Sequence, residues 1–259
     1  MTYVRPKKNL GQHFLTDNNI AKRIADTIDE FPSLPILEVG PGTGMLTKYL
    51  IKKGRDLKVV EIDKESIEYL KENFTELEGK ILEQNFLTLN FSKYWNSPFC
   101  VIGNYPYNIS SQIFFKVLDN KEIIPCCTGM IQKEVAERIA ANPGSKAYGI
   151  LSVLIQAWYD IEYLFTVNEG SFNPPPKVKS SVIKLIRNNR ENLNCNEKLF
   201  KSVVKVCFNQ RRKMIRNPIK ALLPADTQPS DFYLLTKRPE QLTIEQFIEL
   251  TNWVDSMNK

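Results

Sequence analysis

The stretch that decides the fold is Ile36-Leu37-Glu38-Val39-Gly40-Pro41-Gly42-Thr43-Gly44, ILEVGPGTG. It begins as a short apolar run, typical of a buried strand, and continues as a glycine-rich turn before a helical pattern. Glycines in such a turn let backbone N–H groups approach a ligand closely. The spacing is not the dinucleotide fingerprint G-x-G-x-x-G, because Met45 and Thr47 stand where a third glycine is required. No Gly-Lys-Ser/Thr follows, so the turn is not a phosphate-binding P-loop either.

Apolar strands and helical patterns alternate on both sides of this stretch. Strands are expected at residues 36–39, 58–62, 80–83, 99–103 and 123–131. Helices are expected at residues 17–28, 44–53, 64–74, 110–118 and 133–141. Strand–helix alternation with short connections predicts an α/β fold with a doubly wound, mostly parallel sheet.

The pattern changes after residue 141. Residues 149–158 are helix-like, and residues 159–167 and 180–187 are rich in β-formers and could pair as a hairpin-like edge of the sheet. From about residue 191 only helical patterns appear. We therefore expect two domains, a ligand-binding α/β domain over 1–190 and a small, all-helical C-terminal domain over 191–259.

Positive charge is concentrated in segments that lack acidic residues. The chain has 259 residues, 35 Lys and Arg against 29 Asp and Glu, and a net charge of +6. No acid precedes Asp17, and none occurs in PKVKSSVIKLIRNNR (176–190) or KVCFNQRRKMIRNPIK (205–220). Such runs can be solvated faces, but three of them favour a polyanionic partner, most commonly a nucleic acid.

Several classes of site are excluded by composition. The chain has one histidine, His13, and five cysteines without a C-x-x-C pair, so we expect no metal site. No apolar run approaches the roughly 20 residues that span a bilayer. The basic N-terminus has no apolar signal-peptide core, which predicts a cytoplasmic protein.

Polar residues follow the expected strands at the positions where a nucleoside would be bound. The pattern E-x-G-x-G-x-G from Glu38 to Gly44 resembles the first motif of S-adenosylmethionine-dependent methyltransferases. Glu61 ends the second strand roughly 20 residues after the glycine turn, as expected for a carboxylate that accepts hydrogen bonds from ribose hydroxyls. A surface acid at a strand end is the alternative. Asn85, after the third strand, stands where these enzymes usually carry an acid for the adenine amino group; its carbonyl oxygen can accept the same bond, and its amide can donate to a ring nitrogen.

The fourth strand ends in Asn104-Tyr105-Pro106-Tyr107, which fits the Asn/Asp-x-Pro-Tyr/Phe pattern of amino-group methyltransferases. An adenine amino nitrogen is a poor nucleophile because its lone pair is delocalised into the ring. The Asn104 side-chain oxygen and the Tyr105 carbonyl could accept its two protons, with Pro106 fixing the turn. Tyr107 could stack on the extruded base. A turn with exposed tyrosines is the alternative.

The sequence resembles the KsgA-type ribosomal RNA adenine dimethyltransferases, which dimethylate two neighbouring adenosines near the 3′ end of small-subunit rRNA. The resemblance covers almost the whole chain and rests on several segments in order. They are KNLGQHFL (8–15), EVGPGTG (38–44), GNYPYNIS (103–110), QKEVAER (132–138), GSKAYG (144–149), FNPPPKV (172–178) and FNQRRK (208–213). It implies a class I, Rossmann-like methyltransferase domain that uses S-adenosylmethionine.

The resemblance also implies roles for individual residues. Cofactor contacts would fall on His13, Leu15, Gly40, Gly42, Glu61, Asn85 and Asn104. Phe172 would form a second aromatic face of the base pocket opposite Tyr107, although a core phenylalanine is the alternative. His13 stands where the family often has Asn, and a packing or capping histidine is the alternative to a cofactor contact. RNA contacts would fall on Lys177, Arg211, Arg212 and Lys213.

Three functions compete at this stage. The first is a dimethyltransferase that acts on small-subunit rRNA during subunit maturation, as a monomer. The second is a macrolide-resistance type of enzyme that methylates an adenosine of large-subunit rRNA. The third is a ribosome assembly factor that acts mainly by binding. The proline triplet before Lys177 and the run from Phe208 to Lys213 favour the first, and the intact motif from Asn104 to Tyr107 disfavours a purely structural protein.

Overall fold

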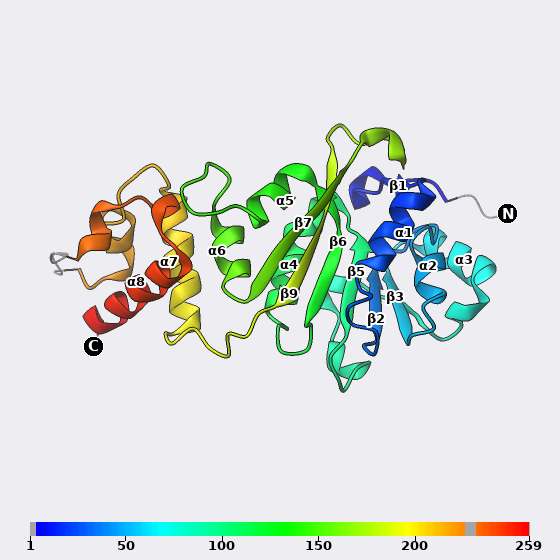
Figure 1. Cartoon of the computed structure of the whole chain (residues 1–259), viewed down its shortest axis with the longest axis horizontal. Helices are drawn as coiled ribbons and strands as arrows, with labels where there is room; N and C mark the ends of the chain where they lie inside the picture. Colours follow the sequence, from blue (N-terminus) through cyan, green and yellow to red (C-terminus); the bar gives the residue numbers. More distant parts are fainter. Residues whose placement is uncertain (1–3, 226–231, 259) are drawn as a thin grey trace. The chain divides into compact units, whose positions relative to one another are not determined.

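A computed structural model of the chain describes residues 4–225 and 232–258 and is built on a seven-stranded sheet (Figure 1). The strand order is β4-β3-β2-β5-β6-β9-β7. The strands are β2 (Ile36–Val39), β3 (Leu57–Glu61), β4 (Ile81–Glu83), β5 (Cys100–Asn104), β6 (Cys126–Gln132), β7 (Tyr159–Val167) and β9 (Ser180–Arg187). A separate two-stranded antiparallel sheet pairs β1 (Phe14–Leu15) with β8 (Phe172–Asn173).

The topology confirms the expected doubly wound sheet. Neighbouring strands from β4 to β6 are parallel, and β9 runs antiparallel to β6. The strand order reverses beside β2, since β3 lies on one side of it and β5 on the other. In open α/β sheets ligands bind beyond the carboxyl ends of the strands at such a switch point. The expected pairing of 159–167 with 180–187 is also confirmed, because β9 and β7 are neighbours at one end of the sheet.

Eight α-helices are found in the described residues. They are α1 (Asn18–Asp26), α2 (Thr47–Ile51), α3 (Lys64–Asn73), α4 (Ser110–Leu118), α5 (Lys133–Ile139), α6 (Ile150–Gln156), α7 (Glu197–Asn209) and α8 (Ile244–Met257). Asp17 begins α1 as expected, because its carboxylate accepts hydrogen bonds from the N–H groups of Asn19 and Ile20 at 2.8 and 3.1 Å. α2 is shorter than the predicted 44–53, since the glycine turn continues as far as Leu46.

The sheet is buried on both faces, which explains the continuous apolar runs of its strands. Side chains alternate between the faces along each strand. Ile36 and Ile102 belong to the core cluster formed with α1, α2 and α3. On the opposite face the ring of Tyr105 meets Phe114 of α4 edge-on, with ring centroids 5.9 Å apart.

The chain divides into two compact units. The first comprises residues 1–136 and 160–187, and the second comprises residues 137–159 and 188–259. In the second unit the Phe208 ring lies between those of Tyr148 and Phe247, with centroids 6.0 and 5.8 Å away. The segment 137–159, which the sequence-based division left in the first domain, is thus grouped with the C-terminal helices. The functional division into 1–190 and 191–259 stays a prediction.

Candidate active site

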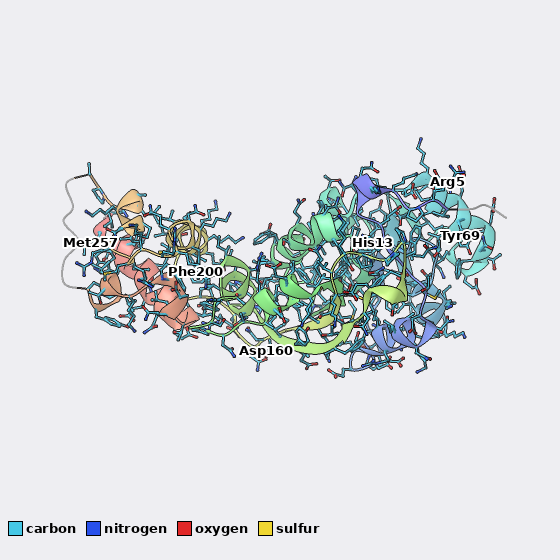
Figure 2. The ribbon with its side chains drawn as sticks, turned by 90° about the horizontal axis from the view of Figure 1, so that it is seen from above. Arg5, His13, Tyr69, Asp160, Phe200 and Met257 are labelled. Atoms are coloured by element: carbon cyan, nitrogen blue, oxygen red, sulfur yellow. The ribbon has the colours of Figure 1, made fainter. Side chains whose placement is uncertain are left out.

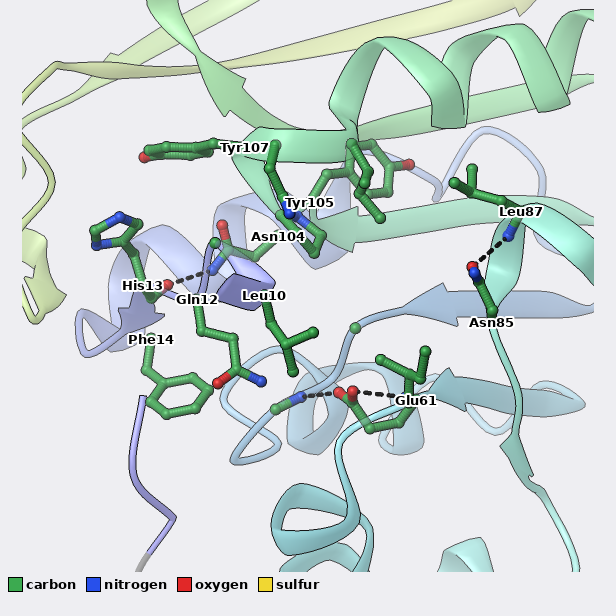
Figure 3. Close-up of a pocket in the computed structure, with 17 residues that line it drawn as sticks. Leu10, Gln12, His13, Phe14, Glu61, Asn85, Leu87, Asn104, Tyr105 and Tyr107 are labelled. Carbon is green, nitrogen blue, oxygen red and sulfur yellow. Dashed lines mark hydrogen bonds between the residues drawn. The ribbon is translucent and has the colours of Figure 1, made fainter. Parts of the chain in front are cut away.

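The candidate site is a pocket of the first unit that lies where β2, β3, β4 and β5 end (Figure 3). Residues that leave these four strands line it, together with a segment near the N-terminus. The lining residues are Leu10, Gly11, Gln12, His13, Phe14, Gly40, Gly42, Glu61, Ile62, Asn85, Leu87, Asn104, Tyr105, Pro106, Tyr107, Asn108 and Ile109. The structure therefore brings together most of the predicted site residues, although they come from five separate parts of the sequence.

The glycine turn has a backbone that other residues would strain. Gly40, Gly42 and Gly44 have φ values of 68°, 55° and 75°, in the left-handed region. A Cβ at Gly44 would lie 2.3 Å from the Phe74 ring, and one at Gly42 would lie 2.8 Å from the Phe14 ring. The turn is therefore fixed in shape both by its conformation and by its neighbours.

Glu61 holds this turn from the end of β3. Its carboxylate accepts hydrogen bonds from the N–H groups of Gly42 at 3.2 Å, Ile62 at 2.8 Å and Asp63 at 2.9 Å. Burial raises the pKa of Glu61, and these three donors oppose that rise. Glu61 thus lies at the expected position in the pocket, where its carboxylate orients the glycine turn through the hydrogen bond from Gly42.

Glu38 is a second buried carboxyl group below the turn. It is 1% exposed, and among the described residues its Oε2 has no hydrogen-bond partner. Burial raises the pKa of Glu38 to about 8, and the charge of Glu61 adds to the rise. The protein therefore favours a protonated Glu38 at neutral pH.

The N-terminal segment is fastened across the pocket by Asp63, which is 2% exposed. Lys7 forms an ion pair with Asp63, and Gln12 and Ser66 donate to the same carboxylate at 3.4 and 2.9 Å. Burial opposes ionisation of Asp63, but these donors outweigh it and lower its pKa. The backbone N–H of Arg5, which is labelled in Figure 2, donates to the carboxylate of Glu65 of α3 at 3.2 Å.

Asn104 ends β5 with a defined side-chain orientation. Its Nδ2 donates a hydrogen bond to the backbone carbonyl of His13 at 3.0 Å. Figure 3 shows the amide oxygen pointing away from that carbonyl, toward the side where the Tyr107 ring lies. The amide thus presents an acceptor rather than a donor to this end of the pocket.

The two tyrosines of the motif have different environments. Tyr105 is 1% exposed, and its hydroxyl donates to the Thr128 carbonyl at 2.7 Å, so it faces the pocket through its backbone. Burial raises the pKa of Tyr105 well above its ordinary value. The Tyr107 ring lies in the pocket wall, and its hydroxyl is hydrogen-bonded to Ser180 of β9. The motif therefore combines a buried anchor with an available aromatic face.

Asn85 lies in the pocket wall, but its carbonyl oxygen already has a partner. It accepts a hydrogen bond from the N–H of Leu87 at 2.9 Å and so caps a short 3₁₀-helix, Phe86–Thr88. The amide N–H₂ is the group that this bond leaves for a ligand. Of the two roles that the sequence offers for Asn85, this bond favours the amide N–H₂ as a donor over the carbonyl oxygen as an acceptor.

Two predicted site residues are not in the pocket wall. Phe172 of β8 pairs with Leu15 of β1, and both are 4% exposed and belong to the hydrophobic core cluster. The Phe172 face opposite Tyr107 and the Leu15 cofactor contact stay predictions, and neither side chain lines the pocket. The reason is that pairing of β1 with β8 directs both side chains into the core. The ring beside Tyr107 is that of His13, with centroids 5.2 Å apart and planes tilted by 31°.

Sequence reasoning missed Leu10, Gln12, Phe14 and Ile62 as lining residues. Ile62 is 55% exposed, which is unusual for a large apolar side chain beside a strand end. Its position next to Glu61 was the signal in the sequence from which Ile62 could have been predicted as a lining residue. For Leu10, Gln12 and Phe14 the available signal was the segment KNLGQHFL, which also contains the predicted cofactor contacts His13 and Leu15.

The predicted RNA-contacting residues lie outside the pocket wall. Lys177 is exposed after the prolines in the first unit. In the second unit Arg212 and Lys213 are exposed, whereas Arg211 donates to the Ser145 carbonyl at 3.0 Å. Arg211 thus joins the segments FNQRRK and GSKAYG within that unit.

Other kinds of site are not found in the part of the chain that the structure describes. Residues 4–225 and 232–258 contain no group of three or more His, Cys, Asp or Glu side chains that could hold a metal ion. None of the described helices combines the length and the apolar character that crossing a bilayer requires.

Comparison with known proteins points to one family. The family described as ribosomal RNA adenine dimethylase matches residues 4–256. A relative from Parabacteroides distasonis, named ribosomal RNA small subunit methyltransferase A, is 64% identical, over 97% of this chain and 94% of its own. A relative of the same name from Bacteroides thetaiotaomicron is 63% identical, over 100% and 97%.

Solved structures agree with this assignment. A dimethyladenosine transferase from Plasmodium falciparum aligns with a TM-score of 0.78 and 25% identity, over 95% of this chain and 98% of its own. The 23S rRNA methyltransferase ErmE aligns with a TM-score of 0.67 and 26% identity, over 92% and 99%.

Proposed function

Since the chain belongs to the ribosomal RNA adenine dimethylase family, we propose that it transfers methyl groups from S-adenosylmethionine to the N6 amines of two adjacent adenosines near the 3′ end of small-subunit rRNA. The observation that carries this proposal is the Asn104 amide. Its Nδ2 is held by the His13 carbonyl, so its oxygen is the group available beside the Tyr107 ring.

The end of the pocket formed by Asn104 to Tyr107 would bind the methyl acceptor, and we call it the acceptor end. It fits an adenine amino group. The oxygen of Asn104 and the carbonyl of Tyr105 can accept its two protons and so localise the lone pair on nitrogen. Pro106, with φ −56° and ψ 130°, follows Tyr105 and fixes the turn that carries the Tyr105 carbonyl. The bond to Ser180 fixes Tyr107, whose ring can stack on the base. Catalysis then depends on positioning rather than on an acid or a base.

The end of the pocket formed by the glycine turn, Glu61, Ile62 and Asn85 would bind the methyl donor, and we call it the donor end. It fits a nucleoside. The left-handed glycines keep the turn free of side chains, Glu61 can accept from ribose hydroxyls, and Ile62 offers an exposed apolar face. The amide N–H₂ of Asn85 can donate to a ring nitrogen. When bound there, S-adenosylmethionine supplies an activated methyl group on a sulfonium centre.

RNA is held by surfaces outside the pocket in this proposal. Lys177, Arg212 and Lys213 are exposed and would contact phosphates, which makes binding salt-dependent. Arg211 is a further proposed phosphate contact, and its guanidinium also donates to the Ser145 carbonyl within the second unit. The catalytic domain would span residues 1–190 and act in the cytoplasm during subunit maturation.

The test is incubation with isotopically labelled S-adenosylmethionine and ribosomal subunits that lack the modification, followed by mapping of the labelled base. We expect two labelled, adjacent adenosines in small-subunit rRNA. Label confined to large-subunit rRNA would refute this proposal and would favour a 23S rRNA methyltransferase activity, as in the name of ErmE. Binding to immature subunits without transfer would identify an assembly factor instead.

A further inference from the structure

His13 is the only histidine of the chain, and its contacts join three segments of the first unit. Its carbonyl accepts from Asn104 Nδ2 at 3.0 Å, and its ring Nδ1 lies 2.9 Å from the carbonyl oxygen of Pro174. Its ring also packs beside Tyr107. One residue thus connects the N-terminal segment, the end of β5 with the loop after it, and the segment that contains Pro174. Figure 3 shows two of these connections, to Asn104 and Tyr107.

The chemistry of these contacts fixes the hydrogen positions. A carbonyl oxygen only accepts, so Nδ1 of the imidazole must carry the hydrogen in the contact with Pro174. By the same argument the NH₂ group of Asn104, and not its oxygen, must face the His13 carbonyl. The tautomer of His13 and the orientation of Asn104 are therefore both determined by carbonyl groups.

We infer that His13 is a positioning residue of the methyl-transfer site, which acts through Asn104 rather than on the donor. Its Nδ1–H, anchored on Pro174, holds the peptide whose carbonyl turns the Asn104 oxygen toward the target amine. This inference rests on the proposed function, because the orientation matters only if an amine is bound there.

A packing role does not account for these contacts. Leu15 and Phe172 fill the neighbouring core, whereas His13 is only half-buried and lines the pocket. Packing against Tyr107 requires a ring of similar size, which phenylalanine also supplies. The anchor on Pro174 requires an N–H donor close to the backbone, which phenylalanine lacks.

Three substitutions separate these roles. His13→Asn places an N–H donor near the position of Nδ1, His13→Gln places one near Nε2, and His13→Phe keeps a ring without a donor. We expect kcat of the Asn variant to stay within about threefold of wild type, while the Gln and Phe variants lose about tenfold. The KM for S-adenosylmethionine should change less than about twofold in all three variants. The inferred contacts of His13 are to Asn104, Pro174 and Tyr107, so their loss should not weaken binding of the methyl donor.

Thermal unfolding of each variant shows whether it is folded. An Asn variant as impaired as the Phe variant would overturn the inference, as would a loss that appears mainly in the donor KM. Failure of the wild-type protein to methylate small-subunit rRNA would instead refute the proposed function.

The wild-type protein gives an independent measurement, because a single histidine yields a single set of imidazole nitrogen signals. Nitrogen-15 NMR of the neutral imidazole should show Nδ1 protonated and Nε2 unprotonated. The opposite tautomer would contradict the anchor on Pro174 and overturn the inference without any substitution.

Discussion

The two ends of the pocket are built in different ways. At the donor end, the glycine turn after β2 and Glu61 of β3 are joined by a hydrogen bond between residues 19 apart in sequence. At the acceptor end, Asn104 is held by a residue 91 positions away and Tyr107 by one 73 positions away. The donor end is shaped mainly by backbone conformation, and the acceptor end by side chains that other segments hold.

This difference teaches where each end is vulnerable. A binding site formed by backbone conformation loses its shape when a substitution makes its φ values unfavourable, and the same substitution destabilises the fold. A side-chain acceptor fails when its orientation is lost, which leaves the fold and the donor site intact. The predictions below test this separation, from the largest expected effect to the smallest.

The first prediction concerns Asn104→Ala. Loss of the acceptor should lower kcat by about 10³-fold, as loss of one preorganised polar group does in other enzymes. Donor affinity, measured by calorimetry, and RNA affinity should stay nearly unchanged. Asn108→Ala is the matched control, because Asn108 lines the same pocket but donates to the Asn9 carbonyl. Wild-type methylation rates in the Asn104 variant would refute the assigned mechanism.

The second prediction concerns Gly44→Ala at the donor end. A Cβ there combines a φ of 75° with a 2.3 Å approach to Phe74, so unfolding free energy should fall by about 3 kcal/mol. Donor affinity should fall with it. Gly54→Ala is the control, since Gly54 has a φ of 66° with nothing within 4 Å of its Cβ, and should lose only about 1 kcal/mol. Equal losses would show that crowding by Phe74 is unimportant.

The third prediction concerns the pH dependence that Glu38 imposes. Burial raises the pKa of Glu38 from 4.5 to about 8, so the folded state binds more protons than the unfolded state between these values. Stability from this group is therefore lost as pH rises, by about 2 kcal/mol between pH 5 and 7. Glu38→Gln should remove this slope and be increasingly more stable than wild type toward pH 8.

Denaturant unfolding at several pH values measures the difference between the two proteins. Glu68→Gln, a change of an exposed acid on α3, is the control and should leave the slope unchanged. A Glu38→Gln protein with the wild-type slope would show that Glu38 is ionised in the folded state at neutral pH.

The smallest effect is expected outside both ends of the pocket. Replacing Arg212 and Lys213 by Ala should weaken RNA binding a few-fold and lower the slope of log affinity against log salt by about 2, without affecting donor affinity. Arg211→Ala should mainly lower the thermal stability of the second unit, because it removes the bond to Ser145. An unchanged salt slope in the Arg212 and Lys213 variant would remove both from the RNA surface.

The sequence predicted the sheet and the donor end well. The glycine turn, Glu61 and the strand ends at Asn85 and Asn104 all line the pocket. Periodicity and turn chemistry are local properties, so they can be read without knowing distant contacts. The burial of Phe172 and Leu15 and the bond from Arg211 to Ser145 could not be predicted in this way, because they depend on segments distant in sequence.

The sequence by itself thus determined the fold, the place of the site at the strand ends and the chemistry of Asn104 to Tyr107. Only the tertiary structure decided which groups orient that chemistry: the His13 carbonyl behind Asn104, Ser180 on Tyr107 and Asp63 beneath the N-terminal segment. The physical reason is that strands and turns follow from neighbouring residues. The orientation of a side chain depends on hydrogen-bond partners that the folded chain brings from far along the sequence.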